Sequence, residues 1–342
     1  MSHIDLVLWT GLAIGLIFGA CGQATGFCLN RGLKEYWSGP DGYKLHAFAL
    51  ALAVALCGTQ ALASAGWVDL QKSLYMMPVY SWLLMPAGGL LFGYGMGLAN
   101  GCGARALVLL GQGNLRSLVV LLCLGIAAYM TLTGLFGPLR VALAGQTSVS
   151  PPVLSVPAGW PRNIALWGGT VALVLFALRK RASGRRAVDL SGGAVIGLLV
   201  VAGWFATGAL GNDDFEPLPV VSLTFVAPIG DAIQYAMIAT GMSLRFGITV
   251  VAGVVAGAFL SALLRRRCRL EGFESPQQML RYMAGGALMG IGGALAFGCS
   301  IGQGLTGLST LSYSSMISAL AIVIGAHLSW KHVSRQNPAD PA

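Results

Sequence analysis

Charged side chains are scarce in this sequence, where Asp, Glu, Lys and Arg make up 10% of the 342 residues. A soluble domain carries about 25% charged residues, so this chain cannot cover a soluble surface of its size. Proline is also infrequent, at 14 residues, and no Gly-X-Y period occurs, which excludes a collagen-like or disordered chain. Hydrophobic residues make up 56%, and the composition therefore predicts an all-α polytopic membrane protein in a lipid bilayer.

Metal and redox motifs are missing as well. The seven cysteines form no CxxC motif, and no Cys/His spacing fits a zinc site. The net charge of +9 comes without a basic, aromatic-interleaved soluble segment, which argues against nucleic-acid binding. We therefore expect no cofactor, no metal and no catalytic residues, and a protein that is not an enzyme.

Nine stretches are long and apolar enough to cross a bilayer, which takes about 20 mostly apolar residues. They are residues 4–22, 45–65, 82–100, 115–136, 163–179, 190–210, 246–264, 281–298 and 314–330. Residues 222–241 are also apolar, but Pro228, Gly230 and Asp231 interrupt them. We interpret this stretch as a broken or re-entrant segment, because irregular backbone at membrane depth must be buried in protein.

The distribution of basic residues supports this count. With nine spans, 17 of the 21 Lys and Arg residues fall on one side of the membrane and four on the other. The positive-inside rule places the basic side in the cytoplasm, so we expect the N-terminus outside and the C-terminus inside. A tenth span at residues 222–241 would carry Arg265–Arg269 to the outside, which argues against it.

Two stretches of the chain repeat each other. Residues 88–102, GGLLFGYGMGLANGC, match residues 285–299, GGALMGIGGALAFGC, at nine of 15 positions, and both end in Gly-Cys. A weaker similarity upstream puts Leu210 where the first copy has Cys28. Close glycine spacing lets helix backbones approach each other in lipid, so these glycines predict tight helix crossings.

The repeat predicts two halves of four spans each, at residues 1–140 and 190–335. An outer Pro-rich loop and a linking span, residues 141–189, separate the halves, and residues 336–342 form a cytoplasmic tail. Because one extra span lies between them, the second half must be inverted relative to the first. Inverted repeats with a site near the midplane are typical of transporters, and a duplicated structural bundle is the alternative.

Three cysteines lie where glycine-rich spans are expected to break into short intramembrane helices: Cys28, Cys102 and Cys299. A broken helix turns unpaired N–H groups toward the gap, which suits an anion. A thiol in apolar surroundings adds a weak, neutral S–H donor that can hold a soft sulphur anion and release it. The residues alone leave open that the three cysteines only pack, as we expect for the other four, Cys21, Cys57, Cys123 and Cys268.

These motifs resemble those of the YeeE/YedE sulphur-transport family of bacterial inner-membrane proteins. The similar stretches are GLIFGACGQATGFCLNRG, GYGMGLANGCGARALVLLGQGN and GGALMGIGGALAFGCSIGQGLTGLS. The resemblance implies a thiosulfate-uptake permease of nine spans with short intramembrane helices and an hourglass-shaped centre. It also implies that three cysteines pass the anion along by hydrogen bonds, here Cys28, Cys102 and Cys299.

Four further residues near these cysteines are weaker candidates for the site. Arg105 could offset the anion's charge or could anchor the protein at the headgroups. Asn30, Asn100 and Gln303 could donate hydrogen bonds to the substrate or could satisfy freed backbone groups at the breaks.

We therefore expect an importer of a small sulphur anion, most simply thiosulfate, with another sulphur or selenium species as an alternative. Two hypotheses come from other classes of protein. One is a membrane thiol–disulfide enzyme, which would need two cysteines on one side of the membrane. The other is a membrane subunit that docks a cytoplasmic sulphur-carrier protein, for which residues 179–186 and 265–269 supply basic segments.

Overall fold

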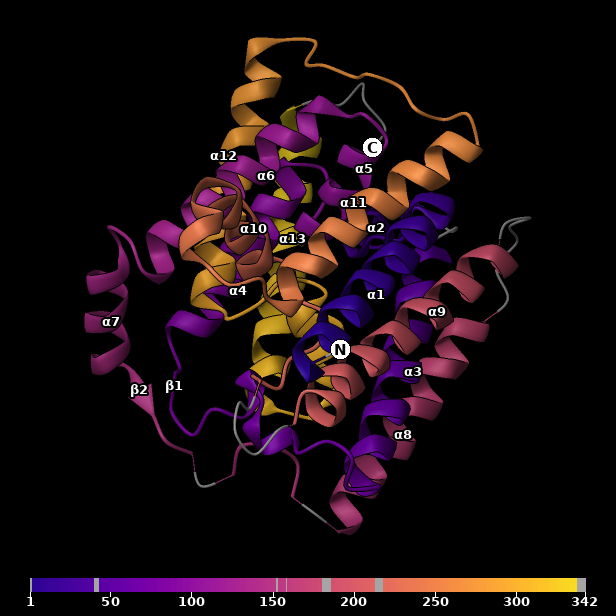
Figure 1. Ribbon diagram of the computed structural model, residues 1–342, viewed down its shortest axis with the longest axis vertical. Coiled ribbons are helices and arrows are strands. Elements are labelled where there is room, and N and C mark those ends of the chain that lie inside the picture. Colours follow the sequence, from indigo (N-terminus) through magenta and orange to yellow (C-terminus); the bar gives the residue numbers. More distant parts are fainter. Residues whose placement is uncertain are drawn as a thin grey trace.

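The computed structural model describes residues 2–39, 43–151, 153–157, 159–179, 186–212 and 218–336 (Figure 1). Most of the predicted basic segment 179–186, and all but Gln336 of the predicted tail, lie outside the described residues. The elements are α1 (His3–Thr25), α2 (Leu29–Ser38), α3 (Tyr43–Ser64), η1 (Leu70–Lys72), η2 (Leu74–Met76), β1 (Tyr80–Ser81), α4 (Leu84–Leu98), α5 (Gly103–Gly111), α6 (Leu115–Leu132), α7 (Gly137–Gln146), β2 (Ser148–Val149), α8 (Trp160–Leu178), α9 (Arg186–Phe205), the π-helix η3 (Ala206–Leu210), α10 (Val226–Ile238), η4 (Ala239–Gly241), α11 (Phe246–Leu264), α12 (Pro276–Leu295), the π-helix η5 (Gly302–Gly307) and α13 (Tyr313–Gln336).

The predicted all-α polytopic fold is confirmed. Seven stretches of the described chain are helical, long and apolar enough to cross a membrane: α1 with α2, α3, α6, α8, α9 with η3, α11 and α13. The other two predicted spans are α4 and α12. α4 has 15 residues, or about 22 Å of helix against a hydrocarbon core of about 30 Å. α12 has 20 residues but begins with the polar sequence PQQ, so the count of nine spans stays a prediction.

The interrupted segment 222–241 forms a short helix inside the fold. Its helical part, α10, has 13 residues, or about 20 Å, which is too short to cross a bilayer. Hydrogen bonds also join the loop between α5 and α6 to the loop between α11 and α12. Arg269 N–H donates to Gln112 O at 3.0 Å, and Leu115 N–H donates to Glu271 O at 2.9 Å. The two loops therefore lie on one face, at the top of Figure 1, which we call the basic face.

The opposite face is formed by loops that are also distant in sequence. β1 pairs with β2 through Tyr80 and Val149, and Ser73 forms a bridge with Val220. Val156 N–H donates to Leu311 O at 3.2 Å. These contacts gather the loops after α3, β2, η3 and η5 on one side of the bundle, at the bottom of Figure 1.

The two glycine-rich helices end in the same way. In α4, Gly101 N–H donates to Met96 O at 3.0 Å, and in α12, Gly298 N–H donates to Gly293 O at 2.9 Å. Between these bonds Asn100 and Phe297 have φ of 56° and 52°. All these positions are related by the 197-residue offset of the sequence repeat. Asn tolerates left-handed backbone, whereas Phe does so only where the surrounding structure enforces it.

α4 and α12 cross each other in opposite directions. A Cβ added to Gly88 would lie 2.6 Å from Gly292 O, and one added to Gly95 would lie 2.6 Å from Gly285 O. The start of each helix thus contacts the end of the other, through glycines that the repeat relates. The second copy is therefore inverted relative to the first.

The two copies are interlocked. The helix that follows each break packs on the glycine-rich helix of the other copy, so α13 lies on α4 and α6 lies on α12. α1 and α9 exchange partners in the same way, with α1 on α11 and α9 on α3. The halves predicted at 1–140 and 190–335 are thus not separate packing units, and their boundaries stay a prediction.

Candidate functional site

The three predicted site cysteines lie at helix breaks in the interior. Cys28 follows the turn at Gly26 and directly precedes α2. Cys102 directly precedes α5, and Cys299 lies between α12 and η5. The three residues are 4%, 2% and 1% exposed. They lie far apart in sequence, and all three are closed off from the lipid by surrounding helices.

Each cysteine sulphur lies near the backbone N–H three residues further on. Cys299 Sγ accepts a hydrogen bond from Gly302 N–H at 3.2 Å. The sulphurs of Cys28 and Cys102 lie near the N–H groups of Arg31 and Arg105. These N–H groups belong to the first turn of a helical segment, where they have no helical partner and attract anions.

Cys28 and Cys102 form a pair of thiols in direct contact. The hydroxyl of Ser300, the residue after Cys299, lies beside Cys102. Ser300 is 1% exposed, and its Oγ has no hydrogen-bond partner among the described residues. A buried polar atom without a partner costs free energy, so the Ser300 hydroxyl is an available donor beside Cys102.

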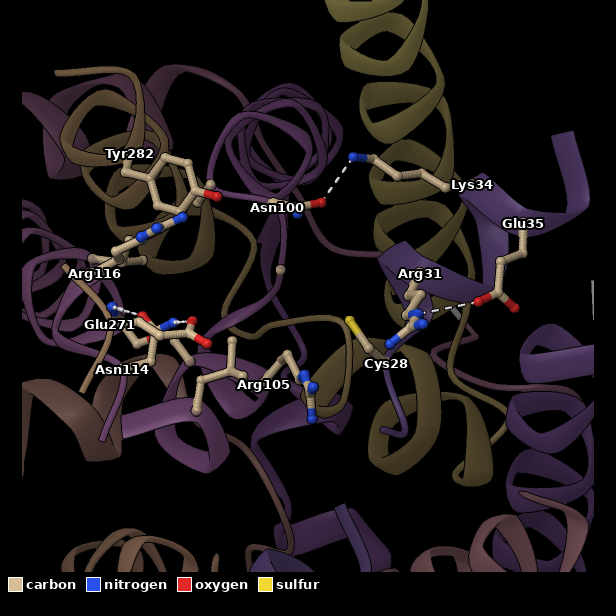
Figure 2. A pocket seen from close by; sticks show the side chains of 16 residues that line it. Cys28, Arg31, Lys34, Glu35, Asn100, Arg105, Asn114, Arg116, Glu271 and Tyr282 are labelled. Atoms are coloured by element: carbon tan, nitrogen blue, oxygen red, sulfur yellow. Dashed lines mark hydrogen bonds and ion pairs between the residues drawn. The ribbon is translucent and has the colours of Figure 1, made fainter. Parts of the chain in front are cut away.

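Cys28, the partner of Cys102, lines a cavity of about 440 Å³ on the basic face (Figure 2). Four basic side chains and two carboxylates lie in its wall: Arg31, Lys34, Arg105, Arg116, Glu35 and Glu271. Figure 2 shows the sulphur of Cys28 facing the cavity, with the guanidinium groups of Arg31 and Arg105 beside it. The cavity is therefore a positively charged compartment next to a thiol.

Arg105 is the arginine of this cavity that pairs with no carboxylate of the described residues. It donates to Gly22 O at 3.2 Å, and no carboxylate pairs with it within the described part of the chain. Arg31, by contrast, pairs with Glu35 at 3.1 Å. A guanidinium that is largely enclosed and lacks a counter-charge attracts an anion, which favours the first of the two roles that the sequence left open.

The predicted amide donors mostly serve the backbone. Asn30 Nδ2 donates to Met96 O at 3.1 Å, and Gln303 Nε2 donates to Ala296 O at 2.5 Å. Met96 lies in the last turn of α4, where its carbonyl also accepts Gly101 N–H, and Ala296 directly follows α12. Asn100 Oδ1 instead accepts a hydrogen bond from Lys34 Nζ at 2.9 Å at the cavity wall. These contacts support the structural role for Asn30 and Gln303.

The remaining cysteines contact neighbouring helices. Cys57 Sγ lies 3.3 Å from Thr170 Oγ1 on α8, and Cys21 Sγ donates to Gly192 O at 3.5 Å. Cys123 packs beside Gly286 of α12, and Cys268 is exposed at the basic face. Among the described residues, no group of three or more His, Cys, Asp or Glu side chains could hold a metal ion.

Comparison with known proteins identifies the family of this chain. The family model described as sulphur transport matches residues 24–328, which contain all three cysteines and both glycine-rich helices. The chain belongs to the sulphur transport family. A protein named thiosulfate transporter TsuA from Escherichia coli K12 is 26% identical over 93% of this chain and 92% of its own length. A second protein of that name, from Spirochaeta thermophila, is 27% identical over 93% of this chain and 97% of its own length.

One part of the sequence interpretation of this family member was wrong. Leu210 does not take the place of Cys28 in the second copy. Cys28 directly precedes a short helix, whereas Leu210 is the last residue of η3 and the next helix, α10, begins only at Val226. α10 is the counterpart of α2: α2 packs on α3 and α13, and α10 packs on α11 and α6. Two residues before α10 contact Cys299: Phe225 through its backbone and Thr224 through its hydroxyl. Sequence reasoning missed Thr224, Tyr75 and Ser300, although Thr224 lies in the segment identified as broken.

Proposed function

We propose that this protein imports thiosulfate by passing it along the thiols of Cys299, Cys102 and Cys28. The observation that carries the proposal is that three buried thiols lie at helix breaks, two of them in contact with each other beside a basic cavity and the third among other polar groups. Membership of a sulphur transport family supports the substrate class. Another sulphur or selenium anion is the alternative substrate.

The chemistry of the site suits an anion that must move on after binding. Thiosulfate has a soft terminal sulphur atom and three harder oxygen atoms. Neutral thiols donate weak hydrogen bonds, so each station holds the anion loosely, and conduction requires such weak binding at several sites. Arg105 then attracts the anion to the cavity after it passes Cys28.

We propose that the basic face is cytoplasmic and that the protein lies in the bacterial inner membrane. The loops at 112–116 and 265–271 share that face, and the positive-inside rule assigns it to the cytoplasm. The N-terminus is then periplasmic and the C-terminus cytoplasmic. The stations consequently run from Cys299 on the periplasmic side to Cys28 on the cytoplasmic side.

Reporter fusions test this orientation. Fusions after Gln146 and Asp213 are expected to report the periplasm, and fusions after Arg186 and Glu271 the cytoplasm. A periplasmic signal after Glu271 would mean that α10 crosses the membrane and that the direction of transport must be reassigned.

Neutralising Arg105 is expected to slow uptake. Arg105→Gln removes the one guanidinium of the cavity without a carboxylate partner but keeps hydrogen-bonding capacity. A hydrogen bond to a charged group contributes about 1.5–3 kcal/mol, so we expect initial uptake to fall about tenfold or more. Arg116→Gln is the matched control, because Arg116 pairs with the exposed Glu274 at 2.7 Å and such pairs contribute about 0–1 kcal/mol. Equal uptake by the two variants would contradict the role of Arg105.

The contact between Cys28 and Cys102 also gives the thiol–disulfide enzyme its only specific support. Alkylation with and without reductant, before and during uptake, separates the two functions. A relay leaves both thiols free throughout, so reductant should change nothing. If Cys28 and Cys102 can be alkylated during uptake only after reductant is added, a disulfide forms in turnover and the protein is a thiol–disulfide enzyme.

Docking of a cytoplasmic sulphur carrier remains a hypothesis for the same face. The loop with Arg265–Arg269 packs against the cavity loop at Gln112, so an acidic partner bound there would receive the anion directly. Uptake by vesicles that contain this protein alone would show that such a partner is not required for transport.

A further inference from the structure

A second polar cluster surrounds Cys299 on the side away from the basic cavity. The Thr224 and Tyr75 hydroxyls both face Gly302: a Cβ added to Gly302 would lie 2.6 Å from Thr224 Oγ1 and 3.3 Å from Tyr75 Oη. Thr224 also contacts Cys299 Sγ, which accepts the Gly302 N–H. One thiol, two hydroxyls and one backbone N–H thus converge on a point where only a glycine fits.

Tyr75 is held rigidly in this cluster by its backbone and its ring. Its carbonyl accepts hydrogen bonds from Ser312 Oγ at 2.8 Å and Ser314 Oγ at 3.3 Å, at the start of α13. Its ring packs edge-on against Trp204, with centroids 6.2 Å apart. Burial raises the pKa of Tyr75, so the phenol stays protonated and can donate a hydrogen bond.

Thr224 is placed by the extended segment that leads into α10. Its neighbours Leu223 and Phe225 are 1% and 0% exposed, and Thr306 Oγ1 donates to Leu223 O at 2.7 Å. Thr224 itself is only partly buried. Its side chain therefore lies between the closed core and the loops of the opposite face.

The inverted repeat gives this cluster a counterpart at the other end of the line. In the first copy the residue before α2, Cys28, contacts Cys102. In the second copy the residue before α10, Phe225, contacts Cys299 only through its backbone, and Thr224, one residue earlier, contacts it through its hydroxyl. The two copies of the repeat thus have different side chains in contact at the break. Two thiols are in contact on the basic side, and a hydroxyl and a thiol are in contact on the other side.

We propose that Tyr75, Thr224 and Cys299 form an outer binding station, in which the two hydroxyls hold the oxygens of the anion and the thiol contacts its terminal sulphur. The proposal rests on the proposed function. An anion that arrives from water must lose its hydration shell, and hydroxyl groups replace water at hard oxygen atoms better than thiols do. The station would thus select an anion that combines hard oxygens with one soft sulphur.

Uptake kinetics in proteoliposomes with thiosulfate on the opposite face test the station. Tyr75→Phe and Thr224→Val each remove one hydroxyl with little change of volume, and each is expected to raise KM about tenfold or more. Vmax should change less than about threefold, because the later stations are intact. Thr224→Ser keeps the hydroxyl and should restore KM to within about threefold of the wild-type value.

Two matched controls distinguish a lost contact from a general defect. Tyr80→Phe alters a tyrosine of the same face, in β1. Thr10→Val alters a threonine of α1 whose hydroxyl donates to Val7 O at 2.9 Å, within its own helix. Both should keep the wild-type KM. Two results would contradict the station while leaving transport by the wild-type protein intact. One is a wild-type KM in both Tyr75→Phe and Thr224→Val. The other is a Thr224→Ser variant as impaired as Thr224→Val. If the wild-type protein takes up no thiosulfate, the proposed function fails and the station fails with it.

Discussion

Cys102→Ala and Cys299→Ala are each expected to reduce thiosulfate uptake about a hundredfold or more while membrane insertion stays normal. Each change removes the S–H donor of one station, so the anion must pass that point with an unsatisfied charge. Loss of a hydrogen bond to a charged group costs up to about 3 kcal/mol, which corresponds to about two orders of magnitude in rate. Replacing a thiol by hydrogen changes little volume, so packing should be nearly preserved. Initial uptake rates, normalised to protein content, measure the effect.

Two cysteines outside the line serve as controls. Cys57→Ala and Cys123→Ala alter thiols that lie between packed helices, and both should keep uptake close to the wild-type rate. Cys102→Ser should recover part of the lost activity, because its hydroxyl donates a hydrogen bond but is harder and better hydrated than a thiol. Full activity of Cys102→Ala would exclude the thiol relay, although not transport itself.

Gly292→Val is expected to prevent stable folding. A Cβ at Gly292 would lie 2.4 Å from Phe92 N and 2.5 Å from Gly88 O, so α4 and α12 would have to separate. Overpacking usually costs about 1–3 kcal/mol, and more where the obstructing atoms are backbone that cannot move away, as they are here. We expect low yield from membranes and a lowered Tm in detergent. Gly95→Val should behave alike, since the repeat places it in the equivalent contact.

Gly168→Val in α8 is the matched control for these substitutions. An added Cβ at Gly168 meets no atom within 4 Å, so yield and Tm should stay near the wild-type values. Wild-type Tm for Gly292→Val and Gly95→Val would contradict the observed crossing of α4 and α12.

Much of this fold could be predicted from the chain itself because lipid imposes simple requirements on sequence. Long apolar stretches specify the seven helices that can cross the membrane. The glycine pattern at residues 88–102 and 285–299 predicted the close crossing, which the contacts of Gly88 and Gly95 now show. The inversion was predicted from the extra span between the halves, and the opposite directions of α4 and α12 agree with it. The same pattern placed Cys102 and Cys299 at helix breaks.

The composition of the site could not be predicted in the same way, because it depends on contacts between distant segments. Thr224 reaches Cys299 because the Ser73–Val220 bridge and the Thr306 hydroxyl hold an extended segment in place. Nothing local to Thr224 encodes those contacts. The assignment of Leu210 failed for a related reason, since the second copy inserts extra chain between its π-helix and α10, which moves the break along the sequence.

Uptake of radiolabelled thiosulfate by proteoliposomes that contain only this protein tests the central claim most directly. We predict uptake above that of protein-free liposomes, inhibition by unlabelled thiosulfate, weak inhibition by sulfate, which lacks the soft sulphur, and loss of uptake in the Cys299→Ala variant. Thiosulfate levels equal to those in protein-free liposomes, or uptake that survives Cys299→Ala unchanged, would contradict transport along a line of thiols.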